Sequence, residues 1–148
     1  METGGRRQET GDRTTVVKKI EKFEDLQVWK VGMQLAVKTY NSLKNCSDFG
    51  LRNQMQRAAV SVPSNIAEGY ERNSNKEFIQ HLFIAKGSCA ELRTQIYIAI
   101  KIGILNELIG NGLLDLTKKI SAINIYRMLN IHIFLVFNIS NIIKPISK

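Results

Sequence analysis

Apolar residues recur at three- and four-residue steps along most of the chain, which is the pattern of amphipathic helices. The first stripe predicts a helix from about residue 25 to residue 44. Its members are Leu26, Trp29, Met33, Ala36, Val37, Tyr40 and Leu43. Because Trp29 and Tyr40 are in phase with the other members, we expect both side chains to belong to the core.

A second stripe predicts a helix over about residues 49–72, after turn-forming side chains interrupt the pattern at residues 45–50. Its members are Leu51, Met55, Ala58, Ala59, Val62 and Ile66. Pro63 lies inside this helix, where a proline removes one backbone hydrogen bond and clashes with the preceding turn. We therefore expect the helix to be kinked at Pro63, or to be replaced by two short helices.

Ser74 and Glu77 form a capping-box pattern, which predicts that a third helix begins directly after Ser74. Gly103 supplies the C-terminal stop, so this helix is about 28 residues or ~42 Å long. Its stripe consists of Phe78, Leu82, Ala85, Cys89, Leu92, Ile96, Ala99 and Ile100.

Asn106 predicts the start of a fourth helix with a seam of alternating four- and three-residue steps. The seam consists of Ile109, Leu113, Leu116, Ile120 and Ile123. The same phase places Arg127 and Asn130 at core positions, so we expect the helix to change its face or to lose its packing near Tyr126. Residues 131–139 are β-branched and aromatic and fit neither a helix nor a strand period.

Four helices with short connections predict an all-α fold, an antiparallel up-down four-helix bundle. The chain then divides into a disordered basic leader (residues 1–22), a four-helix bundle domain (23–130) and an atypical apolar tail (131–148). The uncharged stretch at residues 128–143 is too short and too polar for a membrane span, so no membrane contact is expected.

The third helix carries apolar residues away from its main stripe, on a side that a four-helix bundle leaves exposed to water. They are Phe83, Ile84, Ile98 and Ile102. A symmetric homo-oligomer buries such a second face most simply, so these residues are candidates for an oligomer interface.

Composition narrows the class of protein. The 148 residues are 44% hydrophobic and 23% charged, which excludes disordered, collagen-like and disulfide-dense chains. The net charge is +8, and after Asp115 the chain holds five cations and no acids, a balance that favours anionic partners such as RNA or DNA. Cys46 and Cys89 show neither metal-ligand spacing nor a disulfide framework, and no secretory signal is visible at the N-terminus, so a cytoplasmic protein is expected.

No catalytic motif is present: the chain has no GxSxG, no Walker loop and no HExxH, so an enzyme is not expected, nor any cofactor. The carboxylates Glu68, Glu71, Glu77 and Glu91 do not pair with histidine at the ExxH spacing of a bundle metal site. We therefore interpret them as solvated charges and expect no metal. His81 has no nucleophile beside it in the sequence, so it is assigned no role.

Dispersed cations are the candidate contacts to nucleic acid. They are Arg52, Arg57, Arg72, Lys76, Lys86, Arg93 and Lys101. Repeated around an oligomer, they would form a broad positive field that holds phosphates without reading sequence. The alternative is a solvated basic surface without a ligand.

Several segments resemble a known family: residues 23–26 (FEDL), 29–30 (WK), 56–69 (QRAAVSVPSNIAEG), 76–78 (KEF) and 90–92 (AEL). Together they resemble the bacterial four-helix bundle proteins encoded in intervening sequences of large-subunit ribosomal RNA genes. The resemblance covers about residues 23–130, and residues 57–69 are its most specific part. It implies an antiparallel four-helix bundle, usually a homopentamer, and kinship with the accessory protein of diversity-generating retroelements, which partners a reverse transcriptase and binds nucleic acid.

The resemblance gives no catalytic residues, and the tail departs from it. Either residues 131–143 are an extension that packs on an oligomer or a membrane surface, or they are the translation of an altered reading frame.

The sequence therefore predicts a non-enzymatic, oligomeric helical-bundle protein that binds RNA, or an RNA-bearing partner such as a reverse transcriptase, through a basic surface. The alternative is a protein-interaction scaffold without nucleic-acid contact. The gene neighbourhood would distinguish the two.

Overall fold

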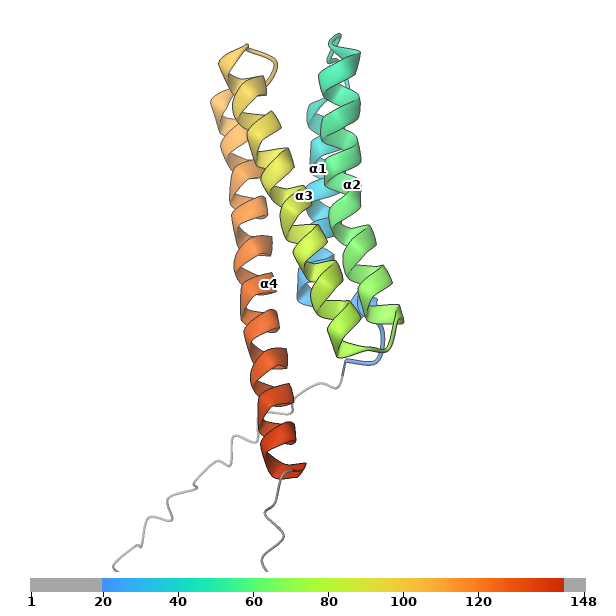
Figure 1. Cartoon of the computed structure of the whole chain (residues 1–148). Helices are drawn as coiled ribbons and strands as arrows, with labels where there is room; N and C mark the ends of the chain where they lie inside the picture. The colour runs from blue at the N-terminus through green and yellow to red at the C-terminus, as the bar shows by residue number, and fades with distance from the viewer. Residues whose placement is uncertain (1–19, 143–148) are drawn as a thin grey trace, which may run out of the picture.

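The computed structural model describes the backbone of residues 20–142 and the side chains of residues 20–130. Within these residues the chain forms a short 3-10 helix, η1, four α-helices and no strand (Figure 1). The bounds are η1 Phe23–Asp25, α1 Gln27–Ser42, α2 Phe49–Glu71, α3 Asn75–Lys101 and α4 Glu107–Ile142. The predicted all-α, four-helix fold is confirmed. Residues 1–19 of the predicted leader (1–22) and the last six residues (143–148) lie outside the described part.

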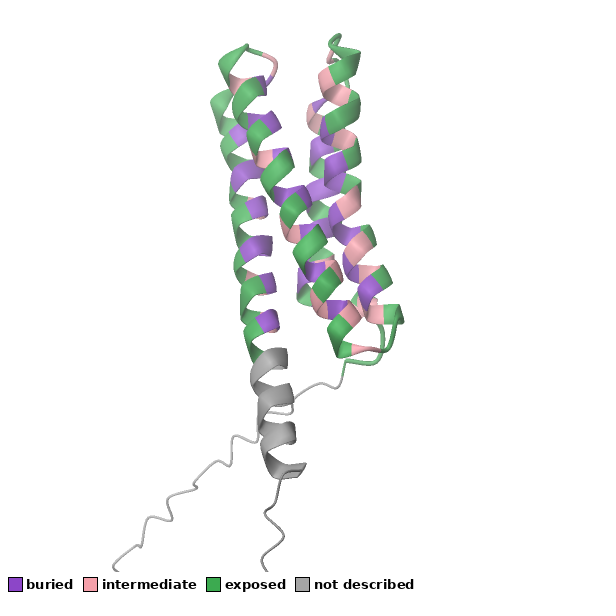
Figure 2. Ribbon diagram, in the orientation of Figure 1, coloured by how far each residue is buried: buried purple, intermediate pink, exposed green. Residues whose placement is uncertain are grey.

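The four helices lie side by side, and the three connections between consecutive helices are at alternating ends of the molecule (Figure 1). α2 packs on both α1 and α3, and α4 packs on α3 and α1. Buried residues line the sides of the helices that face one another, and exposed residues cover the outside (Figure 2).

Side-chain caps begin the helices where the sequence predicts them. The Ser74 hydroxyl accepts a hydrogen bond from the Glu77 amide at 3.5 Å, and the amide oxygen of Asn106 accepts one from the Ile109 amide at 2.8 Å. Gly103 follows α3 with a φ of +78°, a left-handed conformation that glycine adopts without steric cost. The predicted starts of α3 and α4 and the stop at Gly103 are confirmed.

The stripes predicted for α2 and α3 face the core. All their members are buried except Leu51 and Ile100, which are half-buried. α2 is one unbroken helix through the buried Pro63, so the alternative of two short helices is wrong, while a kink at Pro63 stays a prediction. α1 crosses close to this proline, because a Cβ added at Gly32 would lie 3.4 Å from the Pro63 Cβ.

The stripe predicted for α1 is confirmed in part. Leu26, Ala36 and Leu43 are buried, and Trp29 is half-buried against the core, while the other three members are exposed. Met33, Val37 and Tyr40 are 40%, 53% and 46% exposed, so the expectation that Tyr40 is a core residue is also wrong. The buried residues of α1 that the stripe did not include are Val28, Val31, Gly32, Leu35 and Thr39. α1 carries apolar side chains on two arcs, and the arc with Val28, Val31 and Leu35 packs against α2 and α4.

α4 continues as a helix through residues 131–142, for which the sequence predicted no element, while their side chains lie outside the described part. Its buried arc is displaced from the predicted seam. Thr117, Ser121 and Asn124 are buried, and Ile109 is 41% exposed. The Ser121 hydroxyl and both amide atoms of Asn124 have no hydrogen-bond partner among the described residues. Among those residues, no helix combines the length and the apolarity that a membrane span requires.

The close approach of α2 and α3 at Gly69 gives a first prediction. A Cβ added at Gly69 would lie 2.5 Å from the Cβ of His81, so Gly69→Ala requires the two helices to move apart. Overpacking of this kind costs about 1–3 kcal/mol, partly offset by the higher helix propensity of alanine. We expect urea unfolding to show a net loss of about 1 kcal/mol.

Gly112→Ala is the matched control, because no atom lies within 4 Å of a Cβ at Gly112 in α4. This variant should gain about 0.5–1 kcal/mol of stability. A Gly69→Ala protein that is as stable as Gly112→Ala would contradict the contact.

Candidate functional site

The seven candidate cations are accessible to different degrees. Arg57, Arg72, Lys76 and Lys101 are exposed, and Arg52, Lys86 and Arg93 are half-buried. Within the described part of the chain, six of the seven have no carboxylate within 4 Å, and Arg72 is the exception.

The structure does not gather these cations into one patch. Arg72 and Lys76 flank the turn between α2 and α3, while Lys101 ends α3 at the other end of the bundle. Arg57 lines a hollow of about 450 Å³ between α2 and α3 together with Gln54 and Glu91. Lys86 and Arg93 are seven residues apart and so lie on one side of α3.

Arg72 and Arg52 are both engaged within the chain. The Arg72 guanidinium donates to the Glu68 carboxylate at 2.8 Å and lies 3.9 Å from the Glu77 carboxylate. This hydrogen bond, with the nearby charge of His81, lowers the pKa of Glu68, and the same bond raises the pKa of Arg72. The Arg52 guanidinium lies 4.6 Å from the centre of the Phe49 ring. Their charges are therefore less available to a phosphate than that of Arg57.

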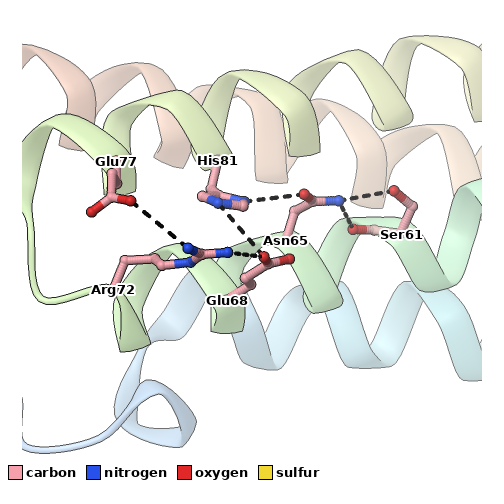
Figure 3. A network of polar contacts seen from close by, with 6 residues as sticks. All are labelled: Ser61, Asn65, Glu68, Arg72, Glu77 and His81. Atoms are coloured by element: carbon pink, nitrogen blue, oxygen red, sulfur yellow. Dashed lines mark hydrogen bonds and ion pairs between the residues drawn. The ribbon is translucent and has the colours of Figure 1, made fainter.

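The contacts of Arg72 belong to a polar network between α2 and α3 (Figure 3). The Asn65 amide nitrogen donates to the Ser61 carbonyl at 2.8 Å, and its amide oxygen accepts from Nδ1 of His81 at 3.3 Å. Nε2 of His81 lies 4.0 Å from the Glu68 carboxylate. The hydroxyls of Ser61 and Ser88 share a hydrogen bond of 2.9 Å.

This network lies in the seam between α2 and α3, and in the described residues His81 meets no hydroxyl or thiol. His81 meets an amide on one side and a carboxylate on the other, and Asn65 separates it from the hydroxyl of Ser61. Burial raises the pKa of the Cys89 thiol to about 11, so this side chain stays a neutral, poorly nucleophilic thiol. Among the described residues, no group of three potential metal ligands is present.

Sequence reasoning missed the network. It assigned His81 no role and treated Glu68 as a solvated charge. The available signal was the four-residue spacing of Ser61 with Asn65 and of Glu68 with Arg72, which places each pair on one side of α2.

The apolar side chains predicted to face away from the core of α3 do so. Phe83, Ile84, Ile98 and Ile102 are 56%, 44%, 45% and 58% exposed. We call these four residues the α3 ridge.

A second apolar surface, not predicted from the sequence, lies between α1 and α2. It is a hollow of about 370 Å³ lined by Phe23, Trp29, Met33, Ala36, Val60, Pro63, Ser64 and Ala67. The exposed side chains of Tyr40 on α1 and Phe49 on α2 lie on the same sides of these helices as the lining residues, nearer the other end of the bundle. We call these ten residues the α1–α2 groove. The error in the stripe of α1 hid it, because Met33 and Tyr40 were assigned to the core.

The chain matches a known protein family and has the fold of a solved structure. A family model described as 23S rRNA-intervening sequence protein matches residues 24–126. The fold is similar to the crystal structure of a protein of unknown function from the S23 ribosomal protein family of Bacteroides thetaiotaomicron VPI-5482. That likeness has 21% sequence identity and a TM-score of 0.65, and covers 68% of this chain and 97% of that one. At this identity it shows the fold alone. No curated protein matches the chain.

The polar network gives a second prediction. Asn65→Ala removes the hydrogen bonds to His81 and Ser61 and leaves their polar atoms partly buried. We expect a loss of about 1–2 kcal/mol in the free energy of unfolding. Ser42→Ala is the control, because the Ser42 hydroxyl donates to the Lys38 carbonyl of its own helix and lies outside both apolar surfaces. Equal stabilities of the two variants in urea unfolding would show that the network contributes nothing.

Proposed function

Because the chain belongs to the family of 23S rRNA-intervening sequence proteins, we propose that it is a non-enzymatic, oligomeric helical-bundle protein that binds RNA through its exposed cations. The observation that carries the proposal is that six candidate cations lack a carboxylate partner among the described residues. Apart from Arg52, which lies over the Phe49 ring, their charge is available to phosphate oxygens, which contribute most of the affinity of proteins that bind nucleic acid without reading its sequence.

The dispersion of these cations favours binding by an assembly over binding by a single copy. One chain presents Arg57 on α2 and Lys86 with Arg93 on α3, too few and too scattered for a strong site. A ring repeats each cation once per copy. We propose a homopentamer in the cytoplasm, following the resemblance, whose RNA ligand can be free or carried by a partner such as a reverse transcriptase.

A protein-interaction scaffold without nucleic-acid contact is the second candidate function. The exposed α3 ridge favours it, because an apolar face of this kind is typical of a protein interface and needs no RNA. The two functions differ in their response to salt, since phosphate contacts weaken steeply as salt rises.

The third prediction tests phosphate contact. For single-stranded RNA, the logarithm of the affinity should fall with the logarithm of salt by about 0.7 per phosphate contacted, with weak sequence preference. Replacing Arg57, Lys86 and Arg93 together by Gln should reduce this slope by about two units per chain engaged. Filter binding across a salt series measures it.

The control is the pair Lys118→Gln and Lys119→Gln, on the exposed side of α4 and outside the candidate set. It should leave the slope nearly unchanged. Arg72 is kept because it is already ion-paired, and Lys76 and Lys101 are kept because they lie at the two ends of α3, beside the ridge. A wild-type protein that binds neither single-stranded nor structured RNA at low salt would rule out the RNA function and leave the scaffold.

The fourth prediction tests the assembly. Ile98→Asp places a charge on the α3 ridge, so it should dissociate the oligomer while helix content stays unchanged, because Ile98 is 45% exposed in the single chain. Light scattering and circular dichroism measure the two quantities. Leu108→Asp is the control, since Leu108 is 85% exposed on α4 and lies outside the ridge. A wild-type protein that runs at 16.8 kDa at micromolar concentration would contradict the oligomer.

A further inference from the structure

Among the apolar surfaces that the described residues expose are the α3 ridge and the α1–α2 groove, and they belong to different helices. α3 packs on α2 and α4 and makes no contact with α1. One surface consists of two exposed apolar pairs, Phe83 with Ile84 and Ile98 with Ile102, and the other is a hollow between two helices. An interface that joined ridge to ridge would leave the groove uncovered.

The two surfaces have matching dimensions along the bundle. Ile84 and Ile98 on the ridge are 14 residues apart, which is roughly 21 Å along a helix. In the groove, Phe49 and Pro63 on α2 are separated by the same number of residues. Each surface therefore has two apolar ends with the same spacing.

These ends also lie at the same heights. The bond between Ser61 and Ser88 places these two residues side by side, and Asn65 with His81 shows that the numbering of α2 and α3 runs in opposite directions. Ile84 precedes Ser88 by four residues, so it is level with the residue four after Ser61, residue 65, beside the groove residues Pro63, Ser64 and Ala67. Ile98 follows Ser88 by ten residues, so it is level with the residue ten before Ser61, residue 51, next to Phe49.

Charges at the two ends are complementary. Exposed lysines lie at both ends of α3, Lys76 in its first turn and Lys101 beside the ridge residue Ile102. By the same register, two exposed carboxylates lie at corresponding heights: Glu71, the last residue of α2, and Asp48, its N-cap, which also accepts from the Leu51 amide. Two copies standing side by side with their bundles parallel would thus bring each lysine near a carboxylate of the neighbour, where opposite charges attract.

We propose that the α3 ridge of one copy packs into the α1–α2 groove of the next copy, which makes the interface head-to-tail. The proposal rests on the oligomer proposed above and identifies the surface that receives the ridge. Because each copy then has one ridge and one groove on different faces, successive copies close into a ring when the rotation between them permits.

Complementary variants test the interface. Ile84→Asp damages the ridge and leaves the groove intact, and Val60→Asp does the reverse. Each variant alone should be monomeric. An equal mixture should form a heterodimer of twice 16.8 kDa and nothing larger, because only one intact interface remains per pair. Ala122→Asp, on the exposed side of α4, is the control and should keep the wild-type size.

Trp29 provides an independent readout, because it is the single tryptophan of the chain and lies half-buried in the groove. The ridge of a neighbour would cover it, so Ile84→Asp should shift its fluorescence to longer wavelength although Ile84 is on another face of its own chain. The emission of Trp29 therefore shows whether the ridge of a neighbour covers the groove, even if Val60→Asp does not fold.

Two results would overturn the interface. In the first, Val60→Asp keeps the wild-type size, and Ile84→Asp dissociates the oligomer without changing Trp29 emission. The ridge then pairs with another ridge, and the oligomer survives without this interface. If the wild-type protein is monomeric, the oligomer itself fails, and the interface with it.

Discussion

The close approach of α2 to its neighbours is the constraint on which the rest of the structure depends. Glycine permits it on both sides, at Gly32 against Pro63 and at Gly69 against His81. With the backbones this close, short side chains can bond across the α2–α3 seam, as the hydroxyls of Ser61 and Ser88 do. The seam in turn fixes how far α3 is shifted along α2, and therefore the heights at which the ridge and the groove residues lie.

The sequence predicts the buried face of a helix well where one apolar arc is clearly the larger, and poorly where two arcs are comparable. On α2 one stripe dominates, and on α3 the eight-residue stripe is larger than the ridge, so the predicted core residues are buried, except the half-buried Leu51 and Ile100. On α1, Val28, Val31 and Leu35 form one apolar arc and Met33 and Val37 belong to another, and periodicity alone does not say which arc meets the neighbouring helices. On α4 the core includes Thr117 and Asn124, which a search for apolar spacing passes over.

The candidate site shows the same division between local and non-local information. Exposure of Arg57 and of Ile98 follows from their positions on one helix, so the sequence predicts both. The pairing of Arg72 with Glu77, the contact of His81 with Asn65 and the groove between α1 and α2 each join two segments of the chain. Such features depend on how two helices are rotated and shifted, and no spacing within either helix encodes that.

The buried polar atoms of α4 have a consequence for the order in which the bundle opens. Each buried donor or acceptor without a partner costs about 1–3 kcal/mol, and α4 contains three such atoms among its described residues, on Ser121 and Asn124. α4 also ends the bundle in sequence, so it can leave without breaking a connection between two other helices. We therefore expect local fluctuations to open α4 before the α2–α3 pair, whose described residues contain one such atom on each helix, and the backbone amides of α4 to exchange with solvent hydrogen sooner. The α2–α3 pair would then be the slowest-exchanging part of the described chain.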